Sequence, residues 1–410
     1  MKENSDKFNK LLEQILTIRS DLTRERILQL IEEKKKKVGA GYLTDLGALY
    51  LVINDLGIKL EEYMRPSEIK SERHGVNISS FLLSHKKYQN RTVFFLIDTE
   101  PMRGVYWGQE DLFRDIRGVV RVNLKNVSIR KSKRGTLEVH ANDRSQLLVT
   151  DERYDLRDFV NRFPDLKKHF IIGIVEGPFR TISYKRKDGT EGHGIGFFVR
   201  GQKRVRVVLW DYEGADRIKE GLTLVAGPAV FKSSAFGDEA ALLNPFNMEL
   251  YPSIMSIYRA QQGAMLLDEF GHVHPAKVPQ ECIESKSIVV IEAKYEFPTF
   301  NVIKCTSYEG ATSYKPVLDK IASAEKGYVS LDFIMLSEVS MKTPNRYEAI
   351  IGDDTGEGVL IIPSELIQSA KKLSVGEKVR ALGLLALGEQ KFMMNEYTVF
   401  LNPETFEQIT

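Results

Sequence analysis

The pattern of hydrophobic and polar residues divides the chain into a helical start and a longer region of short strands. In LTDLGALYLVINDLG, apolar residues recur every three or four positions, as on one face of an α-helix. Thr44 precedes this stretch as an N-cap, and Gly57 follows it as a stop signal. LTRERILQLIEEKKKK repeats the pattern with Thr23 as its N-cap. We therefore expect a small helical module over residues 1–70.

After about residue 75 the pattern changes to short alternating segments, which are typical of half-buried strands. In KRVRVVLWD, residues 203–211, three apolar side chains share one face, while Trp210 shares the other face with the arginines. Three longer segments have the same order of strand, turn, strand, short helix or loop, strand, turn and strand. They run from Thr92 to His140, from Gly194 to Leu243 and from Tyr347 to Tyr397. The chain therefore contains an internal repeat of whole domains.

One further strand before each segment gives five strands with a short helix between the third and the fourth. This is the order of an OB-fold, a small Greek-key barrel. An SH3-like barrel would also have short strands but would not need the inter-strand helix. The predicted fold class is mainly β, with three tandem OB-fold barrels after the helical module. We expect OB-fold 1 over residues 76–152, OB-fold 2 over 168–253, a linker with some local helix over 254–285, and OB-fold 3 with extra N-terminal strands over 286–405.

Composition narrows the classes of function. The 58 Lys and Arg nearly balance the 56 Asp and Glu, so only local clusters of charge can indicate a charged partner. No apolar run approaches the roughly 18 residues that span a membrane, and the polar start lacks the apolar core of a signal peptide. Cys282 and Cys305 leave no disulfide framework, which fits a reducing compartment. We expect a cytoplasmic, intracellular and nucleoid-associated protein with no membrane partner.

The second unit combines basic residues with aromatic rings. OB-folds bind single strands through a basic groove along the backbone and through rings on which bases stack. Alternation puts Phe198 on the face of Arg200, and the last hairpin places two phenylalanines around a polar tip. The candidate contacts in this unit are Tyr184, Lys185, Arg186, Lys187, Phe198, Arg200, Arg204, Arg206, Trp210, Phe231, Lys232 and Phe236.

The first unit is also basic, and Trp107 has the position of Trp210. Its last hairpin, IRKSKRG, carries cations in place of aromatic rings, so we expect phosphate contacts more than stacking there. The candidate residues are Trp107, Arg130, Lys131, Lys133 and Arg134.

The third unit differs in both respects. Between residues 327 and 400 there are seven Lys and Arg against ten Asp and Glu, and Ile362 takes the position of Trp210. These features predict a barrel that contacts proteins. The alternative is a weak DNA-binding barrel with Phe392 as its stacking ring.

Structural explanations compete with these assignments. A tryptophan can cap the end of a barrel, and a basic cluster can be a solvated strand face. Ring and charge occur together in the first two units and are both missing from the third, which favours base stacking at Trp210.

The sequence offers little support for catalysis, a metal or a cofactor. His272, His274, Cys282 and Cys305 have no standard zinc spacing. GAGYLTDLG lacks the Lys-Ser/Thr ending of a phosphate-binding loop. No carboxylate pair or Ser-His-Asp set stands out, so we expect no enzyme, no metal and no cofactor.

Several motifs together resemble one family. VRVVLWD with the RKDG loop ahead of it, the GDDTG turn at 352–356 and the N-terminal LIEEKKKKVGAGYLTDLGALYLVINDLG are similar to archaeal replication protein A and related single-stranded DNA-binding proteins. The resemblance covers most of the chain and is most specific in the second unit. It implies that Trp210, Phe231 and Phe236 stack on bases, whereas Trp107 matches by position alone. The cysteine-rich zinc element of many relatives is not present in this sequence.

These observations favour a non-enzymatic protein that binds single-stranded DNA with little sequence preference in replication, repair and recombination. OB-fold 3 or the N-terminal helices would then contact other replication or repair proteins. Two alternatives remain open, an RNA-binding OB-fold protein and a scaffold of OB-folds that binds only proteins.

Overall fold

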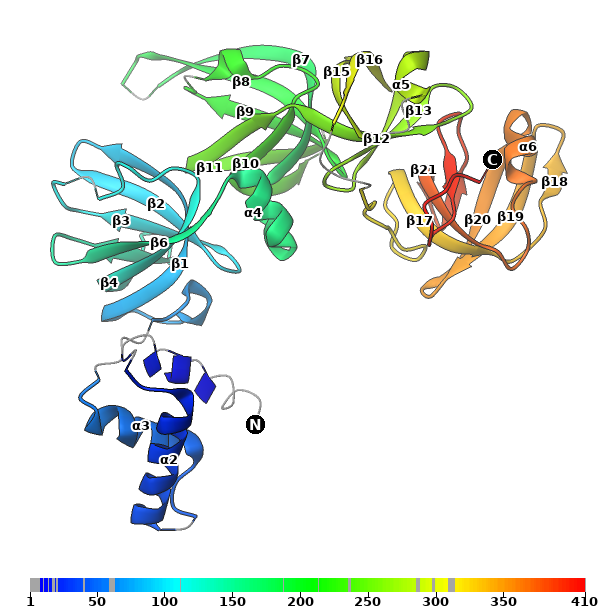
Figure 1. Cartoon of the computed structure of the whole chain (residues 1–410). Helices are drawn as coiled ribbons and strands as arrows, with labels where there is room; N and C mark the ends of the chain where they lie inside the picture. Colours follow the sequence, from blue (N-terminus) through cyan, green and yellow to red (C-terminus); the bar gives the residue numbers. More distant parts are fainter. Residues whose placement is uncertain are drawn as a thin grey trace.

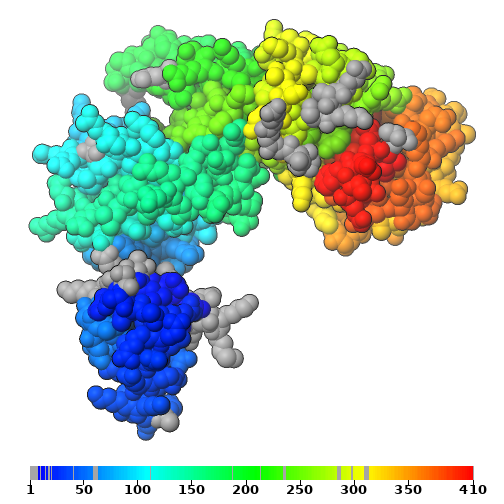
Figure 2. All heavy atoms as spheres, in the orientation of Figure 1, coloured from blue at the N-terminus to red at the C-terminus, as the bar shows by residue number. Residues whose placement is uncertain are grey.

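The computed structural model describes residues 8–409 except 10, 14, 17–18, 20, 40, 59–62, 111, 187, 213, 235–236, 285–287, 297–298 and 309–313. The chain forms an arch, with helices at the N-terminal end followed by a succession of β-barrels (Figure 1). In the space-filling view the blue N-terminal helices lie at one end of this arch, and the orange and red C-terminal region lies at the other (Figure 2).

The N-terminal region contains α2 (Arg24–Val38) and α3 (Asp45–Asp55). The hydroxyl of Thr23 accepts the backbone N–H three residues later, and Thr44 does the same, so both predicted N-caps are confirmed. The two helices bury a shared apolar face that includes Ile27 and Leu49.

Barrels 1 and 2 have the strand order of an OB-fold. The first strand pairs with the second and the fourth, and the third strand pairs in parallel with the fifth. Barrel 1 contains β1 (Arg73–Tyr88), β2 (Arg91–Ile97), β3 (Pro101–Tyr106), β4 (Val119–Lys131) and β5 (Leu137–Ala141), with β6 (Gln146–Tyr154) added beside β4. Barrel 2 contains β7 (Ile171–Lys185), β8 (Glu191–Arg200), β9 (Arg204–Trp210), β10 (Thr223–Ser234) and β11 (Gly237–Tyr251).

Two more barrels with the same strand order follow. Barrel 3 contains β12 (Ser253–Arg259), β13 (Ala264–Asp268), β14 (Val273–Lys277), β15 (Ile288–Glu296) and β16 (Thr299–Ser307). Barrel 4 contains β17 (Gly327–Met335), β18 (Ser340–Thr343), β19 (Arg346–Asp353), β20 (Gly356–Pro363), β21 (Lys378–Gly388), β22 (Lys391–Met393) and β23 (Val399–Leu401).

Barrel 3 corrects the predicted domain plan. The predicted linker over residues 254–285 is wrong, because its described residues, 254–284, form β12, β13, β14 and the short helix α5 (Gln280–Glu284). The strand pair β15–β16 completes this barrel and does not extend the next one. All five residues of β13 are buried, so the alternation that marks a half-buried strand is missing there. The described residues therefore form four barrels where the repeat predicted three.

The inter-strand helices follow the prediction in part. Short helices occur between the third and fourth strands of barrels 2, 3 and 4, as η3 (Ala215–Arg217), as α5, and as η4 (Ser364–Leu366) with α6 (Ile367–Ala370). In barrel 1 the corresponding residues 112–115 form a turn.

A disulfide joins Cys282 of α5 to Cys305 of β16, with their Cα atoms 5.9 Å apart. The expectation of a chain without a disulfide framework is therefore corrected, because the two cysteines form one disulfide. The cysteines are 23 residues apart in the chain, and only closure of barrel 3 brings α5 against its fifth strand.

Barrels 1 and 2 are joined by a buried apolar cluster around α4 (Leu156–Arg162). Phe159 of this helix packs on Phe81 of barrel 1, with ring centroids 5.1 Å apart. Val225 of barrel 2 and Phe270 of barrel 3 belong to the same cluster. The Ser84 hydroxyl also donates to the carbonyl of Pro245 at 2.7 Å, which adds a polar link between the first two barrels.

No helix in the described parts of the chain combines the length and the apolar character needed to cross a membrane.

Candidate nucleic-acid interface

The β8–β9 hairpin carries five of the twelve predicted site residues of barrel 2, namely Phe198, Arg200, Arg204, Arg206 and Trp210. Antiparallel pairing places Gly194 opposite Trp210, and Phe198 opposite Arg206. The three apolar residues of β9 that were predicted to face inward are buried, so the alternation of this strand is confirmed. Trp210 therefore lies on the outer face with the arginines.

Trp210 is held against the strand with half of its surface open, since 51% of the residue is exposed. The indole lies over Gly194, where a Cβ atom would stand 2.7 Å from ring atom Cε3. The Tyr184 ring meets the indole edge-on, with centroids 4.9 Å apart. Glycine and tyrosine thus fix one flat ring at the surface.

Asp211, which the sequence reasoning missed, ties the β7–β8 hairpin to the end of β9. Its carboxylate accepts the Tyr184 hydroxyl and pairs with the Arg186 guanidinium, each at 2.7 Å. The backbone N–H of His193 donates to the same carboxylate at 3.1 Å. The hydrogen bond from Arg186 is the main reason that the pKa of Asp211 lies well below its usual range. Asp211 therefore orients the tyrosine beside Trp210, and Arg186 is already paired with this carboxylate.

The β10–β11 hairpin contributes an exposed ring and an exposed cation. Phe231 is 41% exposed, and Lys232 follows it at the surface. Arg206 of β9 pairs with Glu239 of β11 at 3.0 Å, with both side chains partly in solvent. Two other predicted residues, Phe236 and Lys187, lie outside the described residues. Lys185 is exposed on the β7–β8 hairpin.

A small cavity of about 260 Å³ opens on the same barrel, between Phe198, Arg206 and four residues that the predicted site did not include. These four are Pro178, Arg180, Gly196 and Phe197.

Arg200 and Arg204, both predicted to contact DNA, have other partners. The buried carboxylate of Glu176 pairs with Arg200 and, at 2.7 Å, with Arg204. Arg200 also donates to the hydroxyl of Tyr295 in barrel 3 at 2.8 Å. The six-residue rise of β9 puts Arg204 about 20 Å from Trp210. These two arginines link barrel 2 to barrel 3 and are not brought together with the tryptophan.

Barrel 1 presents Trp107 just after its third strand, with 47% of the residue exposed. Its indole N–H donates to Nδ1 of His140 at 3.2 Å, and the two rings are nearly parallel. Burial lowers the pKa of His140, so the imidazole stays neutral and accepts this hydrogen bond. The Arg91 guanidinium lies 5.7 Å from the indole centroid. His140 and Arg91 were missed, because neither is close to Trp107 in sequence.

The β4–β5 hairpin of barrel 1 carries the predicted cationic residues. The turn is closed by the Ser132 N–H, which donates to the carbonyl of Thr136 at 2.7 Å. The exposed cations of this hairpin are Arg130, Lys131, Lys133 and Arg134. They lie at the end of β4 and in the turn before β5, and His140 lies near the end of β5, so one strand connects the cations to the tryptophan.

Barrel 4 exposes no aromatic ring at Ile362, the predicted counterpart of Trp210. Ile362 is fully buried and faces the core, so it is not the structural equivalent of Trp210. Phe392, the alternative stacking ring, is buried as well. The outer face of β19 carries Arg346 and Glu348, which pair with each other, and the exposed Ile350 in place of aromatic rings.

In barrel 3, His272 and His274 both lie beside one buried carboxylate. The buried carboxylate of Asp268 lies 3.2 Å from Nδ1 of His272 and 3.0 Å from Nε2 of His274. Among the described residues, no group of three or more His, Cys, Asp or Glu is placed to hold a metal ion.

No protein-family model matches this chain, and no curated protein matches it. Three solved structures with local similarity have low TM-scores. A replication protein A heterotrimer bound to single-stranded DNA has a TM-score of 0.29 and 10% identity, over 79% of this chain and 93% of that one. Pot1pC of Schizosaccharomyces pombe bound to single-stranded DNA has a TM-score of 0.21 and 12% identity, over 22% of this chain and 87% of that one. The Ifi202 HINa domain in complex with 20 bp double-stranded DNA has a TM-score of 0.25 and 10% identity, over 44% of this chain and 99% of that one. Likeness at this level assigns neither a family nor a function to the chain.

Proposed function

We propose that this protein binds single-stranded DNA through the outer faces of barrels 1 and 2. One observation carries the proposal: each barrel exposes a tryptophan directly after or at the end of its third strand, with cations on the same barrel. Trp210 is accompanied by Tyr184 and Phe231, and Trp107 by His140. Such rings stack on bases, while Lys and Arg side chains contact phosphates.

The two barrels would divide this work unequally. Barrel 2 presents more exposed rings, and barrel 1 presents a hairpin with four cations. Stacking and phosphate contacts read little sequence, so the preference among bases should be weak. Affinity should fall steeply as salt rises, because each phosphate contact releases counterions.

In the cell, the protein would coat single strands in DNA replication, repair and recombination without acting as an enzyme. The resemblance of the sequence to archaeal replication protein A supports this role. Barrel 4, with its acidic and aliphatic outer face, and the N-terminal helices would be available to other replication or repair proteins.

The test is a titration of the full chain with poly-dT, an RNA of equal length and duplex DNA at two salt concentrations. Tryptophan fluorescence reports on Trp107 and Trp210 alone, since the chain has two tryptophans. We expect quenching by poly-dT that weakens with salt. Absence of quenching and of salt-sensitive binding would overturn the proposal.

The same titration separates the alternatives. Tighter binding of RNA than of DNA would favour an RNA-binding protein, which the same rings and cations permit. No binding of any nucleic acid would favour a scaffold that binds proteins only.

A further inference from the structure

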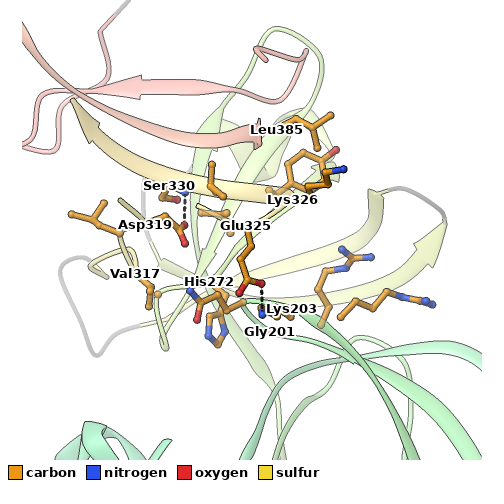
Figure 3. Close-up of a pocket in the computed structure, with 18 of the residues that line it drawn as sticks. Gly201, Lys203, His272, Val317, Asp319, Glu325, Lys326, Ser330 and Leu385 are labelled. Carbon is orange, nitrogen blue, oxygen red and sulfur yellow. Dashed lines mark hydrogen bonds and ion pairs between the residues drawn. The ribbon is translucent and has the colours of Figure 1, made fainter. Parts of the chain in front are cut away.

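A cleft of about 990 Å³ lies where barrels 2, 3 and 4 meet (Figure 3). Barrel 2 lines it with the β8–β9 turn, which carries Lys203. Barrel 3 contributes His272 and Tyr295, and barrel 4 contributes Tyr328 of β17 together with Lys326, which directly precedes this strand. Three barrels therefore build one cavity, and none of the described site residues around Trp210 lies in its wall.

The cleft begins where the outer face of the β8–β9 hairpin ends. Trp210 lies at one end of β9, and Lys203 directly precedes the other end. Phe198 and Arg206 lie between them on the same face. A single-stranded DNA that stacks on Trp210 and follows this hairpin reaches the cleft after about 20 Å.

The walls of the cleft combine cations with aromatic rings, which is the chemistry that binds single-stranded nucleic acid. Tyr295 and Tyr328 come from different barrels. The lysines among the lining residues are Lys203, Lys320 and Lys326. Arg200 and Arg204 also line the cleft, but both are paired with Glu176. The acids among the lining residues are Asp238, Asp319 and Glu325.

Two of these cations have partners that a phosphate can replace. Lys203 pairs with Glu325 across the cleft, as the dashed line in Figure 3 marks, with 52% and 70% of the two side chains exposed. Lys320 pairs with the exposed Asp354. Exposed ion pairs of this kind stabilise a protein by about 1 kcal/mol or less. Asp319, by contrast, accepts the backbone N–H of Ser330 at 3.3 Å and belongs to the wall.

We propose that a single strand bound at Trp210 continues into this cleft, where its phosphates contact Lys203, Lys320 and Lys326. This inference rests on the proposed function. The carboxylate of Glu325 competes with the strand for Lys203, so it limits affinity for DNA instead of supporting it.

Because Glu325 competes with DNA for Lys203, replacing Glu325 and replacing Lys203 should change the affinity for DNA in opposite directions. Lys203→Gln and Lys326→Gln each remove a phosphate contact. The negative slope of log K against log salt should therefore become shallower by about 0.7 for each lysine. Glu325→Gln frees Lys203, so binding of a long strand should tighten severalfold at low salt. All three side chains are exposed, so the variants should fold as the parent chain does.

The experiment uses the full chain and a fluorescent dT oligonucleotide of about 30 nucleotides, long enough for several barrels. Lys372→Gln and Glu338→Gln, both exposed on barrel 4, repeat the two charge changes away from the cleft. We expect these controls to change affinity less than the cleft variants.

Equal effects of cleft and control variants would overturn the inference. So would a loss of affinity in both Lys203→Gln and Glu325→Gln, because the pair would then act as a tie between barrels. If Trp210→Ala weakens binding while the cleft variants match their controls, only the cleft is excluded. If the parent chain does not bind the oligonucleotide, the proposed function fails as well.

Discussion

The two tryptophans occupy similar places on two barrels but rest on different supports. Trp210 lies over a glycine and against the edge of Tyr184. Trp107 lies beside His140 and donates a hydrogen bond to it. Among the described residues, none accepts a hydrogen bond from the indole N–H of Trp210, whereas the indole N–H of Trp107 is bonded to His140. We therefore expect Trp210 to be the stronger stacking surface.

Replacing Trp210 by Ala should weaken binding of single-stranded DNA by about 1–3 kcal/mol, the usual value of one base stacked on an aromatic ring. Titration with dT oligonucleotides measures this loss. Trp210→Phe keeps a flat ring and should retain most of the affinity. If Trp210→Ala instead unfolds barrel 2 in circular dichroism, the ring is a structural cap and the stacking role is wrong.

Glu269 gives a prediction for pH. Burial raises the pKa of this carboxyl to about 7, and its ion-pair partner Arg157 stays 3.7 Å away. In the unfolded chain the group ionises near its ordinary value of 4.5. The native state therefore loses stability as pH rises from 4.5 to 7, by up to about 3 kcal/mol above pH 7.

Glu269→Gln should accordingly raise the melting temperature at pH 8 and leave it unchanged at pH 4. Thermal unfolding of parent and variant at both pH values measures the difference. A lower melting temperature of the variant at pH 8 would mean that the ion pair with Arg157 outweighs the cost of burial.

The site could be predicted from the sequence where a rule of alternation applied, and not where partners come from distant strands. Alternation correctly put Trp210 on the outer face of β9. Glu176 is 24 residues from Arg200, and nothing local reveals that its buried carboxylate neutralises two arginines. Ile362 was matched to Trp210 by aligning segments, and a shift of one residue in a strand exchanges the outer face for the core.

At the scale of elements, the sequence predicted the barrels whose strands are half-buried and missed barrel 3. Its β13 is buried on both faces, and its β14 carries His274, a polar residue that is buried beside Asp268. Both features hide the alternating pattern. The helical caps, by contrast, depend on single side chains next to the helix, so Thr23 and Thr44 were recognised.

The disulfide of barrel 3 should stabilise that barrel. Cross-linking residues 23 positions apart removes conformational freedom from the unfolded chain. This raises the free energy of unfolding by about 3 kcal/mol. A reducing agent should therefore lower the unfolding midpoint of barrel 3 in denaturant. A double variant, Cys282→Ser with Cys305→Ser, should start from the lower midpoint and not respond to the agent. Equal midpoints with and without reduction would contradict this.

At the scale of the whole molecule, the cluster around α4 determines how barrels 1 and 2 are joined. Phe159 is completely buried between them, and Phe270 of barrel 3 belongs to the same cluster. Removing this side chain leaves a cavity between barrels and not inside one.

Phe159→Ala should cost about 3–5 kcal/mol of stability and allow barrel 1 to move relative to barrel 2. Small-angle X-ray scattering should record a larger radius of gyration. Phe333→Ala, inside barrel 4, is the matched control, because it removes an equally buried ring without touching a joint. An unchanged radius for Phe159→Ala would show that polar contacts such as Ser84 to Pro245 hold the barrels by themselves.

The buried joint at α4 also has a consequence for avidity. Since the two barrels are fixed to each other, a strand that is captured by one meets the other as an intramolecular partner, at a high effective concentration. The combined affinity of two weak sites held in this way can exceed the affinity of either single site by a factor of about 10²–10⁴. Each base released from Trp210 would then be recaptured before the strand leaves barrel 1.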